Sequence, residues 1–212
     1  MRVAADAVTL DATLAVPEEA MGVVLFAHGS GSSRHSSRNR SVAGTLHEGG
    51  FATLLLDLLT PDEEVADAST GHLRFDIAML AARLGAATDW VRSDPLLSTL
   101  PVGYFGASTG GGAALVAAAA RPRDIRAVVS RGGRPDLAAD ALPLVRAPTL
   151  FIVGGEDREV LALNEAASRQ MTCAVRIEIV PGATHLFMEH GAIEHVAREA
   201  CGWFVRQLTA RE

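Results

Sequence analysis

The segment Val102-Gly-Tyr-Phe-Gly-Ala-Ser-Thr-Gly110 carries the strongest structural signal in this 212-residue chain. An apolar run, residues 102–105, leads into Gly106-Ala-Ser-Thr-Gly110, and a run of small apolar residues, 113–120, follows. A serine between a strand and a helix, with a glycine two residues away on each side, lies in a sharp, strained turn. We therefore expect Ser108 to present its hydroxyl above the sheet as a nucleophile. The alternative is an ordinary glycine-rich turn.

Apolar runs of similar length recur on both sides of this turn. They cover residues 21–27, 51–56, 127–130 and 149–153 and are bounded by glycine or proline. Continuous apolar runs are typical of strands buried on both faces of a parallel sheet. Residues 175–180 instead alternate apolar and charged side chains, which predicts a half-exposed strand near an edge.

Helical periodicity separates these runs. The apolar side chains that predict a helix ending before Pro95 are Leu73, Ile77, Leu80, Leu84 and Val91. Residues 193–208 predict a closing amphipathic helix, and residues 2–16 an antiparallel strand pair at one edge. The alternation predicts an α/β fold with a doubly wound, mostly parallel sheet, in one domain over residues 1–212. The 18 residues 131–148 are too few for a multi-helix cap.

Composition excludes several classes of function. A net charge of −6 argues against a general nucleic-acid binder, and because all 19 basic residues are arginine, lysine-based chemistry is excluded. No apolar run is long enough to span a membrane, and the first ten residues carry no signal-peptide pattern. Two cysteines, Cys173 and Cys201, suit a reducing compartment. We therefore expect a cytoplasmic protein with no membrane or nucleic-acid partner.

A serine hydroxyl needs a base, and the base needs a group that orients it. Gly154-Gly-Glu-Asp157 and Pro181-Gly-Ala-Thr-His185 each follow a predicted strand, at the sheet edge where Ser108 also lies. The chain order Ser108, Asp157, His185 is the one expected for this architecture. We assign His185 as the base and Asp157 as its orienting carboxylate, with Glu156 as the alternative. The alternative for His185 is a loop histidine that is merely hydrogen-bonded.

A tetrahedral intermediate needs two hydrogen-bond donors for its oxyanion. The backbone N–H of Thr109 is one, because it points out of a helix N-terminus. The second is expected from the loop His28-Gly-Ser-Gly31, with Ser30 as the first choice and Gly29 and Gly31 left open. We expect His28 to fix this loop by packing rather than to act as a second base.

Arginines gather in two loops at the same edge. Arg34, Arg38 and Arg40 follow the first loop, and Arg131 and Arg134 follow the strand at residues 127–130. We expect Arg34 and Arg131 to contact an anionic substrate group. The alternative is that these guanidinium groups pair with acids such as Asp62, Glu63, Glu64 and Asp136, or with loop carbonyls.

Metal binding finds no support in the sequence. His185, His190 and His195 are five residues apart, so they do not share one helix face as a spacing of four would allow. Cys173 and Cys201 have no neighbouring cysteine with which to form a zinc pattern. We expect no metal and no other cofactor.

Together these motifs resemble the α/β-hydrolase fold, in its compact dienelactone-hydrolase-like branch. The motifs that carry the resemblance are the His28-Gly-Ser-Gly31 loop, Gly106–Gly110, Gly154–Asp157 and Gly182–His185, and the similarity runs from about residue 8 to the last helix. Residues 32–40 resemble hydrolase domains that some proteins carry fused to phosphoribosyltransferases. Dienelactone hydrolase itself uses a cysteine nucleophile where this chain has Ser108, a departure that favours a general ester hydrolase.

We therefore expect a metal-free serine hydrolase that acts on small soluble carboxylic esters or lactones through an acyl-enzyme. Two alternatives stay open. One keeps the three residues but transfers the acyl group or acts on a thioester. The other is a catalytically idle domain that binds a small ligand or a partner protein.

Overall fold

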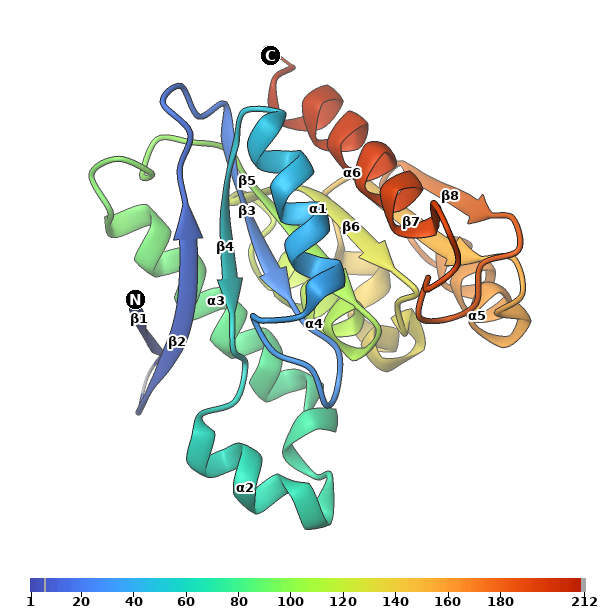
Figure 1. The fold of residues 1–212 in the computed structure, drawn as a ribbon, viewed down its shortest axis with the longest axis horizontal. Coiled ribbons are helices and arrows are strands. Elements are labelled where there is room, and N and C mark those ends of the chain that lie inside the picture. Colours follow the sequence, from blue (N-terminus) through green and yellow to red (C-terminus); the bar gives the residue numbers. More distant parts are fainter. Residues whose placement is uncertain (6, 211–212) are drawn as a thin grey trace.

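An eight-stranded sheet forms the centre of the protein (Figure 1). The computed structural model describes residues 1–5 and 7–210; the predicted domain of residues 1–212 includes residues 6, 211 and 212, which lie outside them. The strand order is β1-β2-β4-β3-β5-β6-β7-β8. The strands are β1 (Arg2–Ala5), β2 (Val8–Ala15), β3 (Gly22–Ala27), β4 (Phe51–Leu56), β5 (Val102–Ala107), β6 (Ile125–Arg131), β7 (Thr149–Gly154) and β8 (Val175–Val180).

The pairing is parallel from β4 across to β8 and antiparallel only at the β1–β2–β4 edge. This confirms the doubly wound, mostly parallel sheet and its antiparallel N-terminal edge. Strands β3, β4, β5 and β7 are buried at every residue, as their continuous apolar sequences predict. Strand β8 lies at the other edge and is only partly buried, which confirms the predicted half-exposed edge strand, although Ile179 of its apolar set is exposed.

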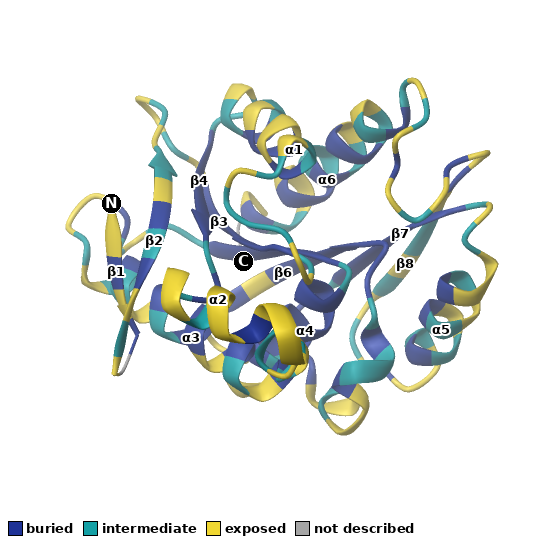
Figure 2. Ribbon diagram, turned by 60° about the horizontal axis from the view of Figure 1, so that its bottom comes forward, coloured by how far each residue is buried: buried dark blue, intermediate teal, exposed yellow. Residues whose placement is uncertain are grey.

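Helices cover both faces of the sheet (Figure 2). They are α1 (Ser37–Glu48), α2 (Pro61–Thr70), η1 (Leu73–Phe75), α3 (Ile77–Ser93), α4 (Thr109–Ala120), η2 (Pro135–Leu144), α5 (Arg158–Ser168) and α6 (Ala192–Leu208), η denoting a 3₁₀ helix. One core packs the sheet against α3 and α4, with side chains from η2 and α5. The other packs it against α1 and α6. Among the described residues no helix is long and apolar enough to cross a membrane.

The segment between Asp57 and α3 differs from its prediction. The helix predicted from Leu73 begins only at Ile77, and η1 and α2 precede it. The carboxylate of Asp67, at the end of α2, accepts the backbone N–H groups of Leu73 and Arg74 and so turns the chain before α3 starts. Asp76 then caps α3 by accepting the N–H of Met79 at 3.0 Å.

Helix α2 projects beyond the carboxyl ends of β3 and β4 (Figure 1). Thr60 and Glu63 form a reciprocal capping box at its start. The Glu63 carboxylate also accepts two hydrogen bonds, of 2.5 and 2.7 Å, from the buried guanidinium of Arg83 on α3. The hydrogen bonds from Arg83 hold the pKa of Glu63 below its ordinary value. Helix α2 is therefore anchored to α3, although few of its residues are buried.

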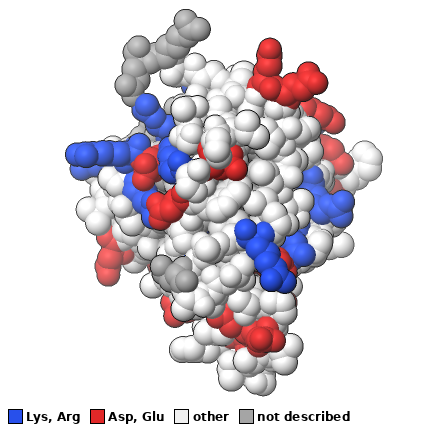
Figure 3. All heavy atoms as spheres, turned by 90° about the vertical axis from the view of Figure 1, so that its left-hand side faces the viewer, with Lys and Arg blue, Asp and Glu red and all other residues white. Residues whose placement is uncertain are grey.

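The N-terminal edge of the sheet has a surface of mixed charge. On the face that Figure 3 shows, arginine side chains lie beside aspartates and glutamates and form no broad patch of one sign. Arg2 and Asp11 pair there across the β1–β2 hairpin, at 3.8 Å. Both side chains are exposed, so this pair adds little to stability.

Candidate active site

Ser108 occupies the sharp turn that its sequence predicts. It lies between β5 and α4 with φ 51° and ψ −120°, a backbone conformation that residues other than glycine rarely adopt. The strain is held by main-chain bonds: the Ser108 N–H donates to Arg131 O at 3.2 Å, and Ser108 O accepts from the N–H groups of Gly111 and Arg134. Helix α4 starts directly after the serine, at Thr109, somewhat earlier than the apolar run indicates.

Gly106 and Gly110 make this turn possible. A Cβ on Gly106 would collide with the backbone of Gly110 and Gly111, and one on Gly110 with the carbonyls of Ala27 and His28. The missing side chains therefore let α4 pass against the ends of β3 and β5 and hold Ser108 in place.

His185 and Asp157 meet Ser108 at the carboxyl end of the sheet. Asp157 lies in the turn after β7, and His185 in the loop after β8. The His185 Nδ1–H donates to Asp157 Oδ2 at 2.6 Å, and His185 Nε2 lies 3.3 Å from Ser108 Oγ. An ionised carboxylate can only accept a hydrogen bond, so Asp157 keeps the imidazole proton on Nδ1. Nε2 therefore carries no proton and is free to accept that of the Ser108 hydroxyl. The structure thus brings the three predicted residues into one hydrogen-bonded chain.

Glu156, the alternative to Asp157, is placed differently. Its backbone N–H donates to Ala183 O at 3.0 Å, which ties the two loops together. Its carboxylate makes no hydrogen bond with His185 among the described residues, and in the structure the orienting position belongs to Asp157.

The loop after β3 is fixed by His28, as expected. Its buried ring accepts the Leu58 N–H at Nε2, at 3.0 Å, and donates from Nδ1 to Gly29 O, at 2.9 Å. Burial lowers the pKa of His28, which favours this neutral form. Both ring nitrogens are occupied, so His28 holds the loop in position rather than offering a base.

Ser30 and Thr109, the two predicted oxyanion donors, lie next to each other. The Ser30 N–H donates to the Thr109 hydroxyl at 2.9 Å. This contact, which the sequence did not reveal, joins the loop after β3 to the first residue of α4. Gly29 also approaches the nucleophile closely, because a Cβ there would lie 3.0 Å from Ser108 Cβ.

A cavity of about 480 Å³ opens beside these donors. Ser30 and Thr109 lie in its wall, while Ser108 and His185 do not. Leu58, Leu59 and Leu80 supply its apolar part, and side chains of α2 and its flanks supply Glu64, Asp67 and Arg74. This wall was not predicted from the sequence, although Leu58 and Leu59 follow β4 after a single residue, Asp57, at the same sheet edge as the other site residues.

The predicted arginine contacts divide into paired and unpaired groups. Arg34, expected to face substrate, forms ion pairs with Asp57 and with Asp11, and its backbone N–H donates to Asp57 Oδ1 at 2.6 Å. Arg34 therefore fits the alternative, in which the loop arginines pair with acids of the chain, and its contact with substrate stays a prediction. Arg134 pairs with Asp136, as the alternative interpretation of these arginines predicted. Arg131 is buried and has no carboxylate partner among the described residues.

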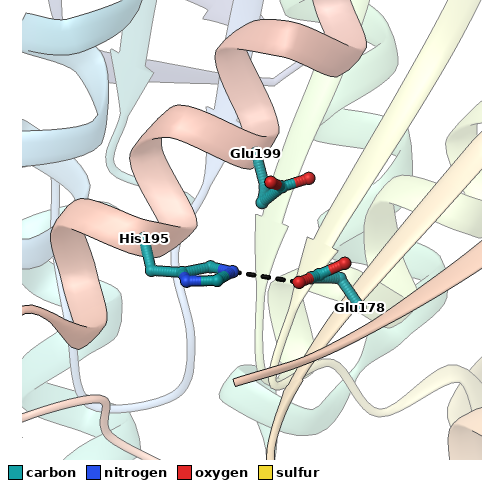
Figure 4. Close-up of side chains that lie close together, drawn as sticks. All are labelled: Glu178, His195 and Glu199. Carbon is teal, nitrogen blue, oxygen red and sulfur yellow. Dashed lines mark hydrogen bonds and ion pairs between the residues drawn. The ribbon is translucent and has the colours of Figure 1, made fainter. Parts of the chain in front are cut away.

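Glu178, His195 and Glu199 form a compact cluster on β8 and α6 (Figure 4). Their side chains are already engaged: Glu178 bonds His195 Nε2 at 3.0 Å, and Arg176 pairs with both carboxylates, at 2.6 and 3.0 Å. Burial alone would raise the pKa of Glu178, but its bonds to His195 and Arg176 outweigh this and lower it. The cluster is explained as an ion-pair network that ties α6 to the edge strand.

Comparison with known proteins identifies the family. The sequence model of the dienelactone hydrolase family matches residues 10–209. A crystal structure of a dienelactone hydrolase from Anabaena variabilis is 58% identical, superimposes with a TM-score of 0.96, and covers 98% of this chain and 96% of that one. Est1E from Butyrivibrio proteoclasticus has the same fold at 19% identity, with a TM-score of 0.84 and 99% of both chains covered.

Two proteins from Mycobacterium tuberculosis strains, named as phosphoribosyl transferases, are 56% identical over 208 residues, which is 98% of this chain. The match is 46% of their length, so this chain spans about half of these relatives. This agrees with the resemblance of residues 32–40 to hydrolase domains joined to phosphoribosyltransferases. The chain belongs to the dienelactone hydrolase family and has the α/β-hydrolase fold.

Proposed function

We propose that the protein hydrolyses carboxylic esters through an acyl-enzyme on Ser108. The observation that carries this proposal is the hydrogen-bonded chain from Ser108 Oγ through His185 to Asp157, with the serine held at a strained turn. A serine at this position, where dienelactone hydrolase has a cysteine, supports ester rather than dienelactone chemistry. The arrangement uses no metal and no cofactor.

Each group has one role in the first half of the reaction. His185 Nε2 takes the Ser108 proton as Oγ attacks the ester carbonyl carbon. Asp157 holds the imidazole and stabilises its positive charge. The leaving alcohol then takes the proton from Nε2, and the acyl group stays on Ser108 as an ester.

Water completes the cycle. It gives a proton to His185 Nε2 as its oxygen attacks the acyl carbon, and the carboxylic acid leaves when Ser108 Oγ takes the proton back. In both halves the Thr109 N–H at the start of α4 donates to the oxyanion. The Ser30 N–H is the second donor. In the free protein it donates to the Thr109 hydroxyl. During the reaction an oxyanion that lies between the Ser30 and Thr109 N–H groups replaces this hydroxyl as the acceptor.

Small acyl groups suit the site. The cavity next to Ser30 and Thr109 has a volume of about 480 Å³, and its wall interrupts three leucines with serines, histidines and acids, which suits a long apolar chain poorly. Residues 131–148 form only the short η2 and add no cap that a lipid surface would need to open. These features favour short, soluble esters over long-chain lipids.

A series of p-nitrophenyl esters from acetate to palmitate tests this expectation. We expect kcat/KM to be highest for acetate to butyrate and to fall by about tenfold or more by the decanoate, because a long chain leaves part of its apolar surface in water. Substrates are kept below their critical micelle concentrations. A higher kcat/KM for palmitate than for acetate would contradict the proposed small-acyl site.

The same three residues also serve acyl transfer and thioester hydrolysis. Product analysis separates these reactions: added alcohol acceptors divert the acyl group in a transferase, whereas a hydrolase releases the acid. The idle-domain alternative has no support in the site, since the hydrogen-bonded chain from Ser108 to Asp157 is complete.

A further inference from the structure

Arg131, the last residue of β6, is a buried cation with no carboxylate partner in the described part of the chain. Arg131 is only 8% exposed. Its Nε and Nη1 atoms are buried and form no hydrogen bond with any described residue, whereas Nη2 does not belong to this buried, unbonded set. Burying a charge without a compensating partner is costly, so such groups are rare unless a ligand completes them.

A second guanidinium lies in the same region. Arg131 stacks over the Phe187 ring, with its Cζ 5.7 Å from the centroid, and Arg38 on α1 donates to the carbonyl of Leu186 at 3.1 Å. Leu186 and Phe187 directly follow His185. Burial, and then the charge of Arg38, lower the pKa of Arg131 to about 10, so that the Arg131 side chain remains cationic at neutral pH.

No acid of the described chain neutralises this pair. Glu189, on the same loop, accepts the Thr184 hydroxyl at 2.6 Å and forms no ion pair with Arg131 or Arg38. Elsewhere at this edge the chain does provide acids: Glu63 faces Arg83, Asp57 faces Arg34, and Asp136 faces Arg134. Unlike Arg34, Arg83 and Arg134, neither Arg131 nor Arg38 has a carboxylate partner among the described residues.

The pair lies on the other side of the nucleophile from the cavity. Phe187, which Arg131 covers, belongs to the core between the sheet and α1 and α6, whereas Leu58 and Leu80 of the cavity belong to the opposite core. Ser108 adjoins both regions: its N–H donates to the Arg131 carbonyl, and Gly29 of the cavity wall approaches its Cβ closely. An ester held at Ser108 can therefore place one end in the cavity and the other toward the arginines.

We propose that Arg131 and Arg38 bind a phosphate monoester group on the substrate, so that the enzyme cleaves small esters whose alcohol part carries a phosphate. This inference rests on the proposed ester hydrolysis at Ser108. A phosphate monoester carries about −1.5 to −2 charges at pH 7, which matches two guanidinium groups better than the single charge of a carboxylate does. Arginine also binds phosphate oxygens in a bidentate manner.

Three acetate esters of similar size test the proposal at constant ionic strength. They are 2-acetoxyethyl phosphate, its carboxylate counterpart 3-acetoxypropanoate, and the neutral 2-methoxyethyl acetate. We expect kcat/KM for the phosphate ester to exceed that for the neutral ester by about 30-fold, the value of charge-assisted hydrogen bonds worth about 2 kcal/mol. In Arg131→Met the ratio should fall to about 3 or less, with a smaller fall in Arg38→Met.

Arg40→Met is the matched control, because it removes the same charge from an exposed position two residues beyond Arg38. It should keep the wild-type preference for the phosphate ester. Equal rates for the phosphate and neutral esters would overturn the proposal, as would a preference that survives in Arg131→Met. A stronger preference for the carboxylate ester would overturn the assignment to phosphate.

A binding measurement separates this proposal from the catalytic one. Calorimetry with 2-hydroxyethyl phosphate and the Ser108→Ala variant needs no turnover: we expect binding that Arg131→Met in the same background weakens about 30-fold. Absence of binding contradicts the phosphate site even if esters are hydrolysed. Binding without hydrolysis in the wild type contradicts only the esterase proposal.

The stability of Arg131→Met gives a further readout. A purely structural arginine loses favourable contacts on substitution, and Tm falls. A buried charge that only a bound ligand neutralises instead destabilises the free protein. Methionine removes this charge and retains most of the apolar stem of the arginine. We therefore expect Tm of the free variant to rise by a few degrees, and a fall of that size would contradict the proposal.

Discussion

Replacing Ser108 by alanine should lower kcat for p-nitrophenyl acetate by about 10⁴- to 10⁶-fold, to a rate close to the background. Without Oγ there is no atom to form the acyl-enzyme, and His185 Nε2 has no hydroxyl from which to take a proton. The loss is this large because the nucleophile and its base act as one unit. Steady-state kinetics of the purified variant measure it.

The control for this variant is Ser41→Ala, an exposed serine on α1. It should keep wild-type kinetics. Alanine at position 108 has to accept the same positive φ of 51° as the serine, so both variants should unfold at temperatures close to that of the wild type. Substantial ester hydrolysis by a folded Ser108→Ala variant would contradict the serine mechanism.

The variant Asp157→Asn should lower kcat by about 10⁴-fold. The Asp157 carboxylate accepts the Nδ1–H of His185 at 2.6 Å and so keeps Nε2 free as the proton acceptor. An asparagine amide can donate to Nδ1 instead, which stabilises the opposite tautomer and removes the base. The pH profile and kcat of the variant measure this effect.

Its matched control is Glu156→Gln, the neighbouring acid exchanged for its amide. Glu156 contacts the His185 loop through its backbone N–H, which the substitution retains. We therefore expect kcat within about threefold of wild type, as for a surface substitution away from the catalytic hydrogen bonds. A large loss in Glu156→Gln with little effect of Asp157→Asn would reverse the assignment of the orienting carboxylate.

The sheet and the three hydrogen-bonded residues of the candidate site could be predicted from the sequence because both depend on local signals. Buried parallel strands are continuous apolar runs, and the loops that follow them meet at one edge, so Ser108, Asp157 and His185 could be placed without knowing a single contact. Helix α1 lacks such a signal, since Val42, Ala43 and Leu46 are its only buried apolar side chains.

Contacts between distant residues account for what the sequence did not predict. Arg34 and Arg131 look equivalent in the chain, yet Arg34 pairs with Asp57, 23 residues away, while Arg131 stacks over Phe187 with no acid partner among the described residues. The bond from Ser30 to the Thr109 hydroxyl joins residues 79 positions apart. The pairing of a guanidinium or of an amide depends on which loops meet, and the periodicity of the sequence does not encode it.

Labelling with a fluorophosphonate probe tests the central claim, nucleophilic attack by Ser108, most directly. The probe phosphonylates an activated serine and needs no knowledge of the substrate, and peptide mass spectrometry locates the modified residue. We expect one adduct per chain on Ser108, absent in Ser108→Ala and much slower to form in Asp157→Asn. Wild-type protein that stays unmodified, or that is modified equally fast at another residue in Ser108→Ala, would contradict it.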